Sequence, residues 1–160
     1  ERIRKKTADF LEICCELGGF IGGMSPADTA QMAEYGRDIG MAFQITDDLL
    51  DFRRSSEDIG KPAGHDLAQG YVTLPVIRAL SVLGAGEREE LAALITNPKK
   101  PVEEVARALA LVRASDGLDY AQEQADAYLV RAKAALPASL DPRIRETCLM
   151  AADFIGRREF

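Results

Sequence analysis

The chain has 160 residues, of which 47% are hydrophobic and 29% charged, and this balance is typical of a globular protein and argues against disorder. Its formal net charge of −6 disfavours nucleic acid as a partner, because phosphate backbones are bound mainly by surplus cations. An acidic chain that binds an anionic substrate needs a metal ion or a local group of cations to do so.

No run of 18 apolar residues exists, so the sequence predicts no membrane span, and no apolar stretch of signal-peptide length follows the cations near the N-terminus. Three cysteines, Cys14, Cys15 and Cys148, are odd in number and lack metal-ligand spacing. They favour a reduced cytoplasmic setting over a disulfide framework, and we expect them to be small buried hydrophobes.

Apolar residues recur at helical spacing nearly throughout. The first predicted helix spans residues 3–23 and ends at a glycine pair, and Ser25 is the predicted N-cap of the second, residues 28–52. A loop rich in Gly and Pro is expected over 55–70. Further helices are predicted over 74–83, 87–96, 102–114, 117–136 and 142–158. Because no segment alternates like a strand, the predicted fold is all-α, with six or seven helices and no sheet.

The second predicted helix carries a polar stripe within an apolar surrounding. Gln44, Asp47, Asp48 and Asp51 fall at i, i+3, i+4 and i+7, which places them on one side of the helix. The other directions are occupied by large apolar residues, namely Met41, Phe43, Ile45, Leu49, Leu50 and Phe52. A helix that is apolar nearly all round is normally buried.

Clustered carboxylates on a buried helix repel one another and lose hydration, which costs several kcal/mol per ion unless something compensates. Oxygen ligands without a nearby His or Cys favour Mg²⁺ over Zn²⁺, and Mg²⁺ usually keeps positions for water and substrate phosphates. We therefore expect Asp47, Asp48 and Asp51 to bind Mg²⁺. Protonated acids, or an acidic stripe exposed on a surface helix, are the alternatives.

The pattern Gly-x-x-Phe-Gln-Ile-x-Asp-Asp-x-x-Asp, from Gly40 to Asp51, resembles the second aspartate-rich motif of the trans-isoprenyl (polyprenyl) diphosphate synthases. Other landmarks of that family follow in the expected order. They are Lys6–Thr7, Gly60–Lys61–Pro62, Gly64, Asp66–Leu67, Gly70, Thr73–Leu74–Pro75 and the closing run from Ala152 to Arg158.

This resemblance implies the later helices of the isoprenoid-synthase bundle, with residues 1–160 as the C-terminal part of one synthase domain whose N-terminal half is absent. It implies a Mg²⁺-dependent head-to-tail condensation of an allylic diphosphate with isopentenyl diphosphate. In that family Asp47 would be the direct ligand of the ion, and Asp48 and Asp51 would support it through bound waters.

The same resemblance assigns catalytic and substrate-binding roles to four further residues. Lys6 and Lys61 would contact diphosphate oxygens, Thr7 would help to position the allylic substrate, and Gln44 would join the polar network near the diphosphate. A solvated helix start is the alternative for Lys6, which follows other cations. A loop hydrogen bond is favoured for His65, and a helix-terminal charge for Arg157 and Arg158.

Two departures from the family pattern limit these assignments. Tyr71 stands where the family usually has Lys or Asn. The first aspartate motif and the homoallylic site of the family are not matched by any segment of this sequence.

The missing half leaves three interpretations open. The chain is the C-terminal piece of a synthase, a short subunit that needs a partner with the first aspartate motif, or a stand-alone Mg²⁺–diphosphate binder or hydrolase. Half a bundle leaves an apolar face unburied, so we expect a homodimer, or a heterodimer with a complementary subunit.

Overall fold

The computed structural model describes residues 1, 3–53, 64–97, 99 and 101–157. These residues form eight α-helices, preceded by one π-helical segment, and they include no strand. The all-α prediction is confirmed. The chain divides into two compact units, Glu1–Thr46 with Gln124–Glu159, and Asp47–Glu123.

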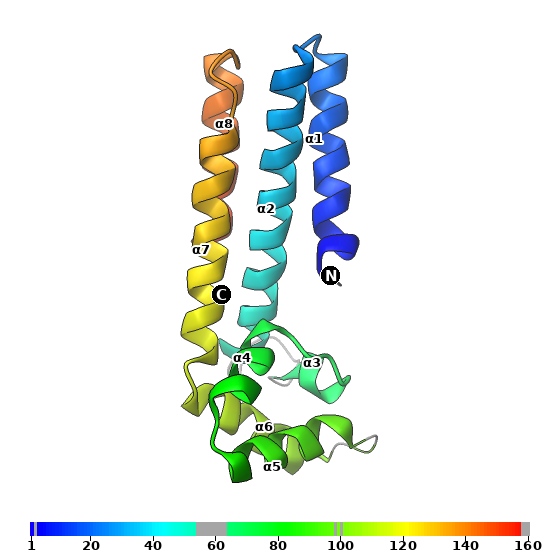
Figure 1. Cartoon of the computed structure of the whole chain (residues 1–160), viewed down its shortest axis with the longest axis vertical. Helices are drawn as coiled ribbons and strands as arrows, with labels where there is room; N and C mark the ends of the chain where they lie inside the picture. Colours follow the sequence, from blue (N-terminus) through cyan, green and yellow to red (C-terminus); the bar gives the residue numbers. More distant parts are fainter. Residues whose placement is uncertain (2, 54–63, 98, 100, 158–160) are drawn as a thin grey trace. The chain divides into compact units, whose positions relative to one another are not determined.

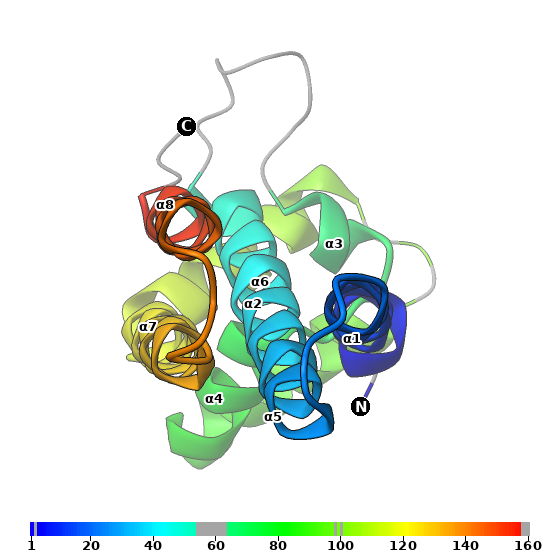
Figure 2. The same ribbon diagram turned by 90° about the horizontal axis from the view of Figure 1, so that it is seen from above.

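The first unit is a helical bundle. It contains the π-helical turn η1 (Arg4–Ala8), α1 (Asp9–Ile21), α8 (Pro142–Gly156), most of α2 (Pro26–Arg53) and the later part of α7 (Gly117–Ala135). Within this unit α2 lies between α1 on one side and α7 and α8 on the other (Figures 1 and 2). Its core consists of Met32, Tyr35, Ile39, Ala42, Leu129, Ala132, Leu136, Ala152 and Ile155.

Glycines of α2 bring the first two helices into close contact. A Cβ atom at Gly40 would lie 2.6 Å from Ala8 Cα, and one at Gly36 would lie 2.4 Å from the Leu11 carbonyl oxygen. Only a residue without a side chain permits that approach. The glycines therefore fix the position of η1 and α1 along α2.

Polar contacts join α2 to the other side of the bundle. The Arg131 guanidinium donates to Asp38, with Nη2 2.7 Å from Oδ1, and lies over the Tyr128 ring at 4.3 Å. Because the Asp38 side chain is almost wholly buried, this ion pair compensates a charge that would otherwise lack hydration. Tyr35 Oη donates to the Cys148 carbonyl oxygen at 2.8 Å, which ties α2 to α8.

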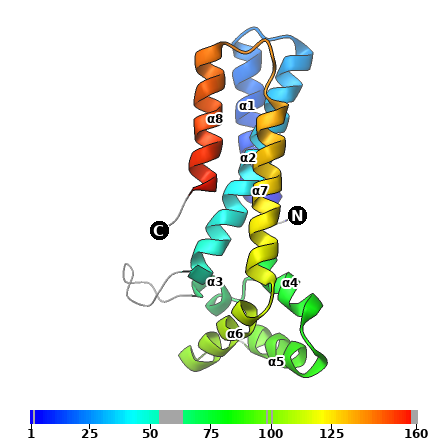
Figure 3. The ribbon, with the colours of Figure 1, turned by 90° about the vertical axis from the view of Figure 1, so that its left-hand side faces the viewer.

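The described part of the second unit contains the end of α2, the start of α7 and, around an apolar core, four short helices. They are α3 (His65–Ala68), α4 (Leu74–Val82), α5 (Ala85–Thr96) and α6 (Val102–Ala114), of which α5 and α6 lie side by side (Figure 3). The core is formed by Phe52, Leu67, Val76, Ala79, Leu91, Ile95, Ala108, Leu109, Leu111 and Val112.

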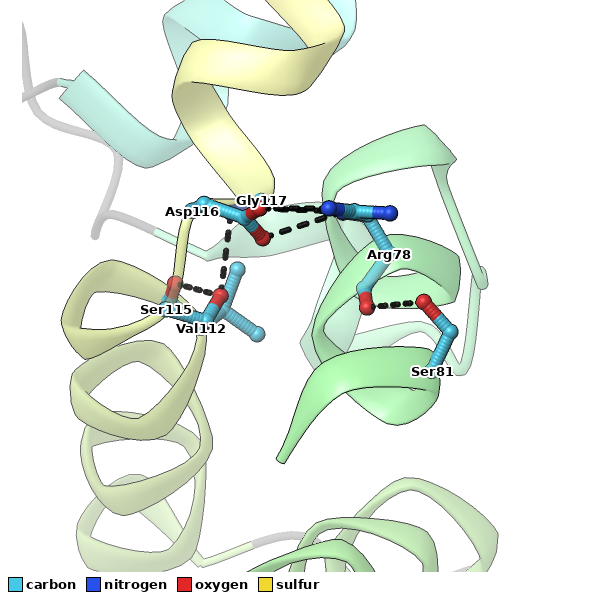
Figure 4. Close-up of polar contacts among 6 residues, drawn as sticks. All are labelled: Arg78, Ser81, Val112, Ser115, Asp116 and Gly117. Atoms are coloured by element: carbon cyan, nitrogen blue, oxygen red, sulfur yellow. Dashed lines mark hydrogen bonds and ion pairs between the residues drawn. The ribbon is translucent and has the colours of Figure 1, made fainter. Parts of the chain in front are cut away.

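The turn between α6 and α7 is held by polar contacts (Figure 4). Ser115 Oγ donates to the Val112 carbonyl oxygen at 2.7 Å and accepts from the Gly117 amide at 3.0 Å. Arg78 of α4 donates from Nε and Nη2 to Asp116 at 3.1 and 2.6 Å, and this pairing lowers the pKa of the Asp116 carboxyl. The start of α7 is thereby tied to α4.

Helix positions agree closely with the sequence predictions, with three corrections. Ser25 is the N-cap as expected, since its Oγ accepts from the Asp28 amide at 3.1 Å. Eight α-helices are described where six or seven were expected, because α3 forms inside the predicted loop. The first helix opens with a π-helical turn. Cys14 is exposed, and Cys15 and Cys148 are only partly buried, so the expectation of three buried thiols is wrong.

None of the described helices is both long enough and apolar enough to cross a membrane.

Candidate functional site

The polar side chains of α2, called here the acidic stripe, lie near the C-terminal end of the helix and differ in exposure. They are Gln44, Asp47, Asp48 and Asp51. Gln44, Asp48 and Asp51 are buried, with 6%, 8% and 9% of their surface exposed, whereas Asp47 is exposed. The alternative of a wholly exposed acidic stripe is therefore wrong. Asp47 is the carboxylate of this stripe that is open to a ligand from solvent.

Asp51 holds the chain segment that begins at Gly64. Its Oδ1 accepts from the His65 amide at 3.1 Å and its Oδ2 accepts from the Asp66 amide at 2.9 Å. Its carbonyl oxygen accepts from the Gly64 amide at 3.1 Å. The two side-chain bonds satisfy free amides at the start of α3, as an N-cap does, although Asp51 is 15 residues away from Asp66.

Gly64 makes this connection sterically possible. Its φ of +79° lies in the left-handed region, and a Cβ atom there would lie 2.8 Å from Leu109 Cδ1 of α6. Glycine avoids both the strain and the clash. The packing of this residue between Asp51 and α6 thus explains why glycine stands at position 64.

Arg113 of α6 pairs with the backbone at the C-terminal end of α2, next to Asp51. Its guanidinium donates to the Phe52 carbonyl oxygen through Nε at 3.0 Å and through Nη2. A cation at the last carbonyls of a helix supplies a missing hydrogen-bond donor and opposes the negative end of the helix dipole. Sequence reasoning missed this role, since Arg113 lies 61 residues from Phe52 and carries no motif.

Two of the predicted substrate-binding residues are in direct contact. Thr7 Oγ1 donates to Gln44 Oε1 at 3.0 Å. The contact follows from the close approach at Gly40, which places Ala8 against α2 one helical turn before Gln44. Thr7 belongs to the π-helical turn, a form that is rare and frequently found at functional sites.

The remaining predicted residues lie partly outside the described part of the chain. Lys6 is exposed on the same π-helical turn. Lys61, with Gly60 and Pro62, lies outside the described residues, so its role stays a prediction, and Arg158 lies outside them too. Tyr71 is exposed, and His65 contributes to the Asp51 contact through its backbone amide.

Two buried hydroxyls, Thr46 Oγ1 beside Asp47 and Thr73 Oγ1 before α4, have no hydrogen-bond partner among the described residues. Buried hydroxyls are normally paired, so each is an unusual feature. Neither was singled out as a site residue from the sequence.

A divalent cation fits the donor chemistry of α2 only in part. No group of three or more Asp, Glu, His or Cys side chains capable of holding a metal is found within the described residues. Asp47 and the adjacent Asp48 offer hard oxygen donors, whereas both Asp51 oxygens already accept amide hydrogen bonds. One or two carboxylates suit Mg²⁺, which takes its remaining ligands from water and phosphate.

Comparison with known proteins identifies the family. Residues 1–112 match the family model of polyprenyl synthetase, and this segment includes the whole acidic stripe. The chain belongs to the polyprenyl synthetase family. The resemblance found in the sequence is thereby confirmed.

Curated polyprenyl synthetases match nearly all of the chain. Heptaprenyl diphosphate synthase component 2 of Geobacillus stearothermophilus is 36% identical over 99% of this chain and 48% of its own length. The short chain isoprenyl diphosphate synthase of Methanothermobacter thermautotrophicus is also 36% identical, over the same shares. The chain thus spans about half the length of the curated relatives it matches.

Solved structures of the family share the fold. The geranylgeranyl pyrophosphate synthetase of Pyrococcus horikoshii Ot3 superimposes with a TM-score of 0.87 at 29% identity, over 98% of this chain and 47% of that chain. A polyprenyl synthase of Caulobacter crescentus CB15, solved with calcium and isoprenyl diphosphate, superimposes with a TM-score of 0.84 at 34% identity, over 98% of this chain and 48% of that one. The predicted isoprenoid-synthase fold is confirmed.

Proposed function

We propose that residues 1–160 are the C-terminal part of a polyprenyl synthase domain that carries out Mg²⁺-dependent prenyl transfer. The reaction would join an allylic diphosphate head-to-tail to isopentenyl diphosphate and release diphosphate. The observation that carries this proposal is the polyprenyl synthetase match over residues 1–112, which covers the acidic stripe of α2. The Caulobacter crescentus relative, solved with calcium and isoprenyl diphosphate, supports the substrate class.

That reaction requires a metal ion and further positive charge near the diphosphate, and the chain has residues suited to both. Asp47, with Asp48 beside it, would hold Mg²⁺, which when bound neutralises the negative charge that develops on the departing diphosphate. Asp51 would keep the following segment in place through its three hydrogen bonds, as a positioning residue. Lys6 and Lys61 would add positive charge toward the diphosphate oxygens.

Positioning of the allylic group is assigned to Thr7 and Gln44. Their hydrogen bond fixes the direction of both side chains on the buried side of α2. The C–O bond to the diphosphate breaks, the alkene of isopentenyl diphosphate forms the new C–C bond, and a proton leaves to the released diphosphate. Such a reaction depends on alignment and on exclusion of water more than on a protein base.

We propose further that activity requires residues that this chain does not contain. A first aspartate motif and a homoallylic site would come from the half of the synthase fold that this chain does not span, whether in the same or in a second polypeptide. Relatives called component 2 of heptaprenyl diphosphate synthase, from Geobacillus stearothermophilus and Bacillus subtilis, support a reading as one part of a larger assembly. The alternative is a dimer of two identical chains. Measuring the mass of the complex in solution distinguishes this dimer from an assembly with the missing half.

The function is tested with the chain co-expressed with the unmatched part of the Geobacillus stearothermophilus relative. We expect elongated prenyl diphosphate only when both parts and Mg²⁺ are present. Asp47→Ala should lower turnover by at least about 10², as for the loss of a strong electrostatic contact in a transition state. Glu89→Ala, which removes an exposed acid of α5, is the matched control and should leave turnover unchanged.

Unchanged turnover in Asp47→Ala would refute the metal role. Release of diphosphate without any elongated product would instead favour the hydrolase alternative. Radiolabelled isopentenyl diphosphate and a diphosphate assay on the same samples distinguish these results.

A further inference from the structure

The two carboxylates proposed for Mg²⁺ lie in the final turns of α2. In an α-helix the amide of each residue donates to the carbonyl four residues before it. The amides of Asp51 and Phe52 therefore donate to the carbonyls of Asp47 and Asp48, and these bonds close the end of the helix. The backbone that carries Asp47 and Asp48 keeps its geometry only while this end stays closed.

Donors from outside the helix hold its last carbonyls. The last four carbonyls of a helix have no partner within it, and helix ends fray. In α2 the Asp51 carbonyl oxygen accepts from the Gly64 amide at 3.1 Å. The Phe52 carbonyl oxygen accepts from Arg113 through Nε at 3.0 Å and through Nη2. These contacts oppose fraying of the turn that follows Asp47 and Asp48.

Arg113 reaches the Phe52 carbonyl from a packed helix. It lies in the last turn of α6, and Leu109 and Val112 of that helix belong to the same apolar core as the Phe52 side chain. Phe52 is therefore held through its side chain and through its carbonyl. A guanidinium offers its donors in a fixed plane, so it restricts the direction of this carbonyl more than a single ammonium would.

We infer that Arg113 is a positioning residue for the proposed metal site: it keeps the last turn of α2 helical and thereby fixes the direction in which Asp47 and Asp48 are presented. The inference rests on the proposed function insofar as these carboxylates bind Mg²⁺, whereas the contact with α2 does not depend on it. Mg²⁺ demands near-ideal octahedral geometry, and Ca²⁺ accepts a flexible ligand shell. Loosening of the helix end should therefore weaken binding that depends on Mg²⁺ more than binding that depends on Ca²⁺.

A helix cap that adds only stability is the alternative. Arg145 makes a similar contact in the first unit, where its Nη1 donates to the Leu136 and Pro137 carbonyl oxygens at 3.1 and 3.0 Å, just after α7. An arginine at a helix end is therefore not enough to indicate positioning.

The end of α2 is held on several sides within the second unit. The Asp51 carboxylate is bound by the start of α3, and the Phe52 carbonyl by Arg113 of α6. Arg53 Nη2 donates to Gln122 Oε1 of α7 at 3.0 Å. Three consecutive residues are thus bound by three separate segments. Restraint from several directions sets the position of a turn as well as its stability, which is what a metal site on that turn requires.

Amide hydrogen exchange of the chain, without metal or substrate, measures this restraint. Arg113→Met keeps the apolar length of the side chain but removes its donors. We expect the amides in the last turn of α2 to exchange at least about tenfold faster, because this turn opens locally without global unfolding. Arg145→Met is the matched control, since it removes a similar contact from the first unit, and it should leave exchange in α2 unchanged.

The same data distinguish positioning from a loss of global stability. A less stable chain exchanges faster at its protected amides in every helix. Loss of positioning is confined to the end of α2.

Calorimetric titration with an allylic diphosphate, in Mg²⁺ or in Ca²⁺, measures the effect on the proposed site. Arg113→Met should lower the affinity in Mg²⁺ at least about fivefold, and the affinity in Ca²⁺ less, because Ca²⁺ tolerates displaced ligands. Arg113→Lys keeps the charge but not the planar fork, so its affinity in Mg²⁺ should be intermediate. Arg145→Met should bind like the unmutated chain.

Three results would overturn the inference. They are unchanged exchange at the end of α2 in Arg113→Met, faster exchange to the same extent in every helix, and an affinity loss that is equal in Mg²⁺ and Ca²⁺. An unmutated chain that binds no allylic diphosphate in Mg²⁺ would refute the proposed function, and the exchange data would still decide whether Arg113 holds α2. Binding that Asp47→Ala abolishes and Arg113→Met leaves unchanged would refute the positioning role and leave the proposed function standing.

Discussion

Asp47 and Asp51 are carboxylates of one helix face, but their oxygens have different surroundings. Asp47 is exposed, whereas the Asp51 carboxylate accepts two amide hydrogen bonds from the start of α3. Similar side chains in one motif therefore serve different purposes. The residue that holds the fold and the residue that is open to a ligand can be separated by experiment.

Asp51→Asn should destabilise the free chain. The asparagine keeps one acceptor oxygen but presents an NH₂ group to the other amide, so a buried donor loses its partner at a cost of about 1–3 kcal/mol. Urea denaturation of the chain without Mg²⁺ measures this change. Asp47→Asn, on the same helix but exposed, should change the unfolding free energy by less than about 0.5 kcal/mol. Equal losses in the two variants would contradict the structural role of Asp51.

The partly buried thiol of Cys15 should make the free energy of unfolding fall at alkaline pH. Burial, followed by the neighbouring Cys148 thiol, raises the pKa of Cys15 to about 11 from an ordinary value of 9.0. Below pH 9 the thiol is protonated in both the folded and the unfolded chain. Between pH 9 and 11 the unfolded chain loses that proton first, so the free energy of unfolding falls as pH rises.

Cys15→Ala should therefore lose less stability between pH 9 and 11 than the unmodified chain. Some decline will remain, because burial also raises the pKa of Tyr35 far above its ordinary value. Thermal denaturation across this range is the measurement. Cys14→Ala, which removes an exposed thiol, is the control and should keep the original slope. Identical slopes for Cys15→Ala and the unmodified chain would rule out this contribution.

Among the elements, helices with a strong local signal were predictable. The N-cap at Ser25 and the apolar periodicity of residues 102–114 and 117–136 are encoded by neighbouring residues, and they match α2, α6 and α7 closely. The acidic stripe was likewise visible, because helical spacing alone places its members on one side of α2. Local sequence patterns were sufficient for these features.

Features that depend on distant partners were not predictable in this way. The start of α3 is satisfied by Asp51, and the end of α2 by Arg113, 61 residues beyond Phe52. The π-helical turn and the Thr7–Gln44 contact depend on a glycine of the next helix. Each requires the tertiary arrangement, on which local propensity gives no information.

Gly40→Ala tests how closely η1 is held against α2. The new methyl group would lie 2.6 Å from Ala8 Cα, so backbone must shift, and overpacking of this kind costs about 1–3 kcal/mol. Gly18→Ala is the control, since a Cβ atom there meets nothing within 4 Å and alanine favours a helix over glycine by up to about 1 kcal/mol. Thermal denaturation should show Gly40→Ala lowered and Gly18→Ala raised. A stabilised Gly40→Ala would show that η1 is not in close contact.

At the scale of the whole molecule, the chain resembles its relatives in fold but spans about half of their length. Apolar side chains remain exposed on α1, α7 and α8, which agrees with this difference in length. Substrate binding is expected to be incomplete for the same reason, because one or two carboxylates cannot fill the ligand shell of Mg²⁺.

The isolated chain should therefore bind an allylic diphosphate weakly and only with Mg²⁺, and it should produce no elongated product. Mg²⁺ gives up its water reluctantly and needs diphosphate oxygens as ligands, while the diphosphate needs the positive charge of the ion. Calorimetric titration with and without Mg²⁺ measures this dependence. Lys61→Ala should lower the affinity, and Lys99→Ala, which removes a cation near the start of α6, is the control. Binding that is equally tight without Mg²⁺ would rule out the metal role of Asp47 and Asp48, whereas elongated product from the isolated chain would show that its 160 residues contain a complete site.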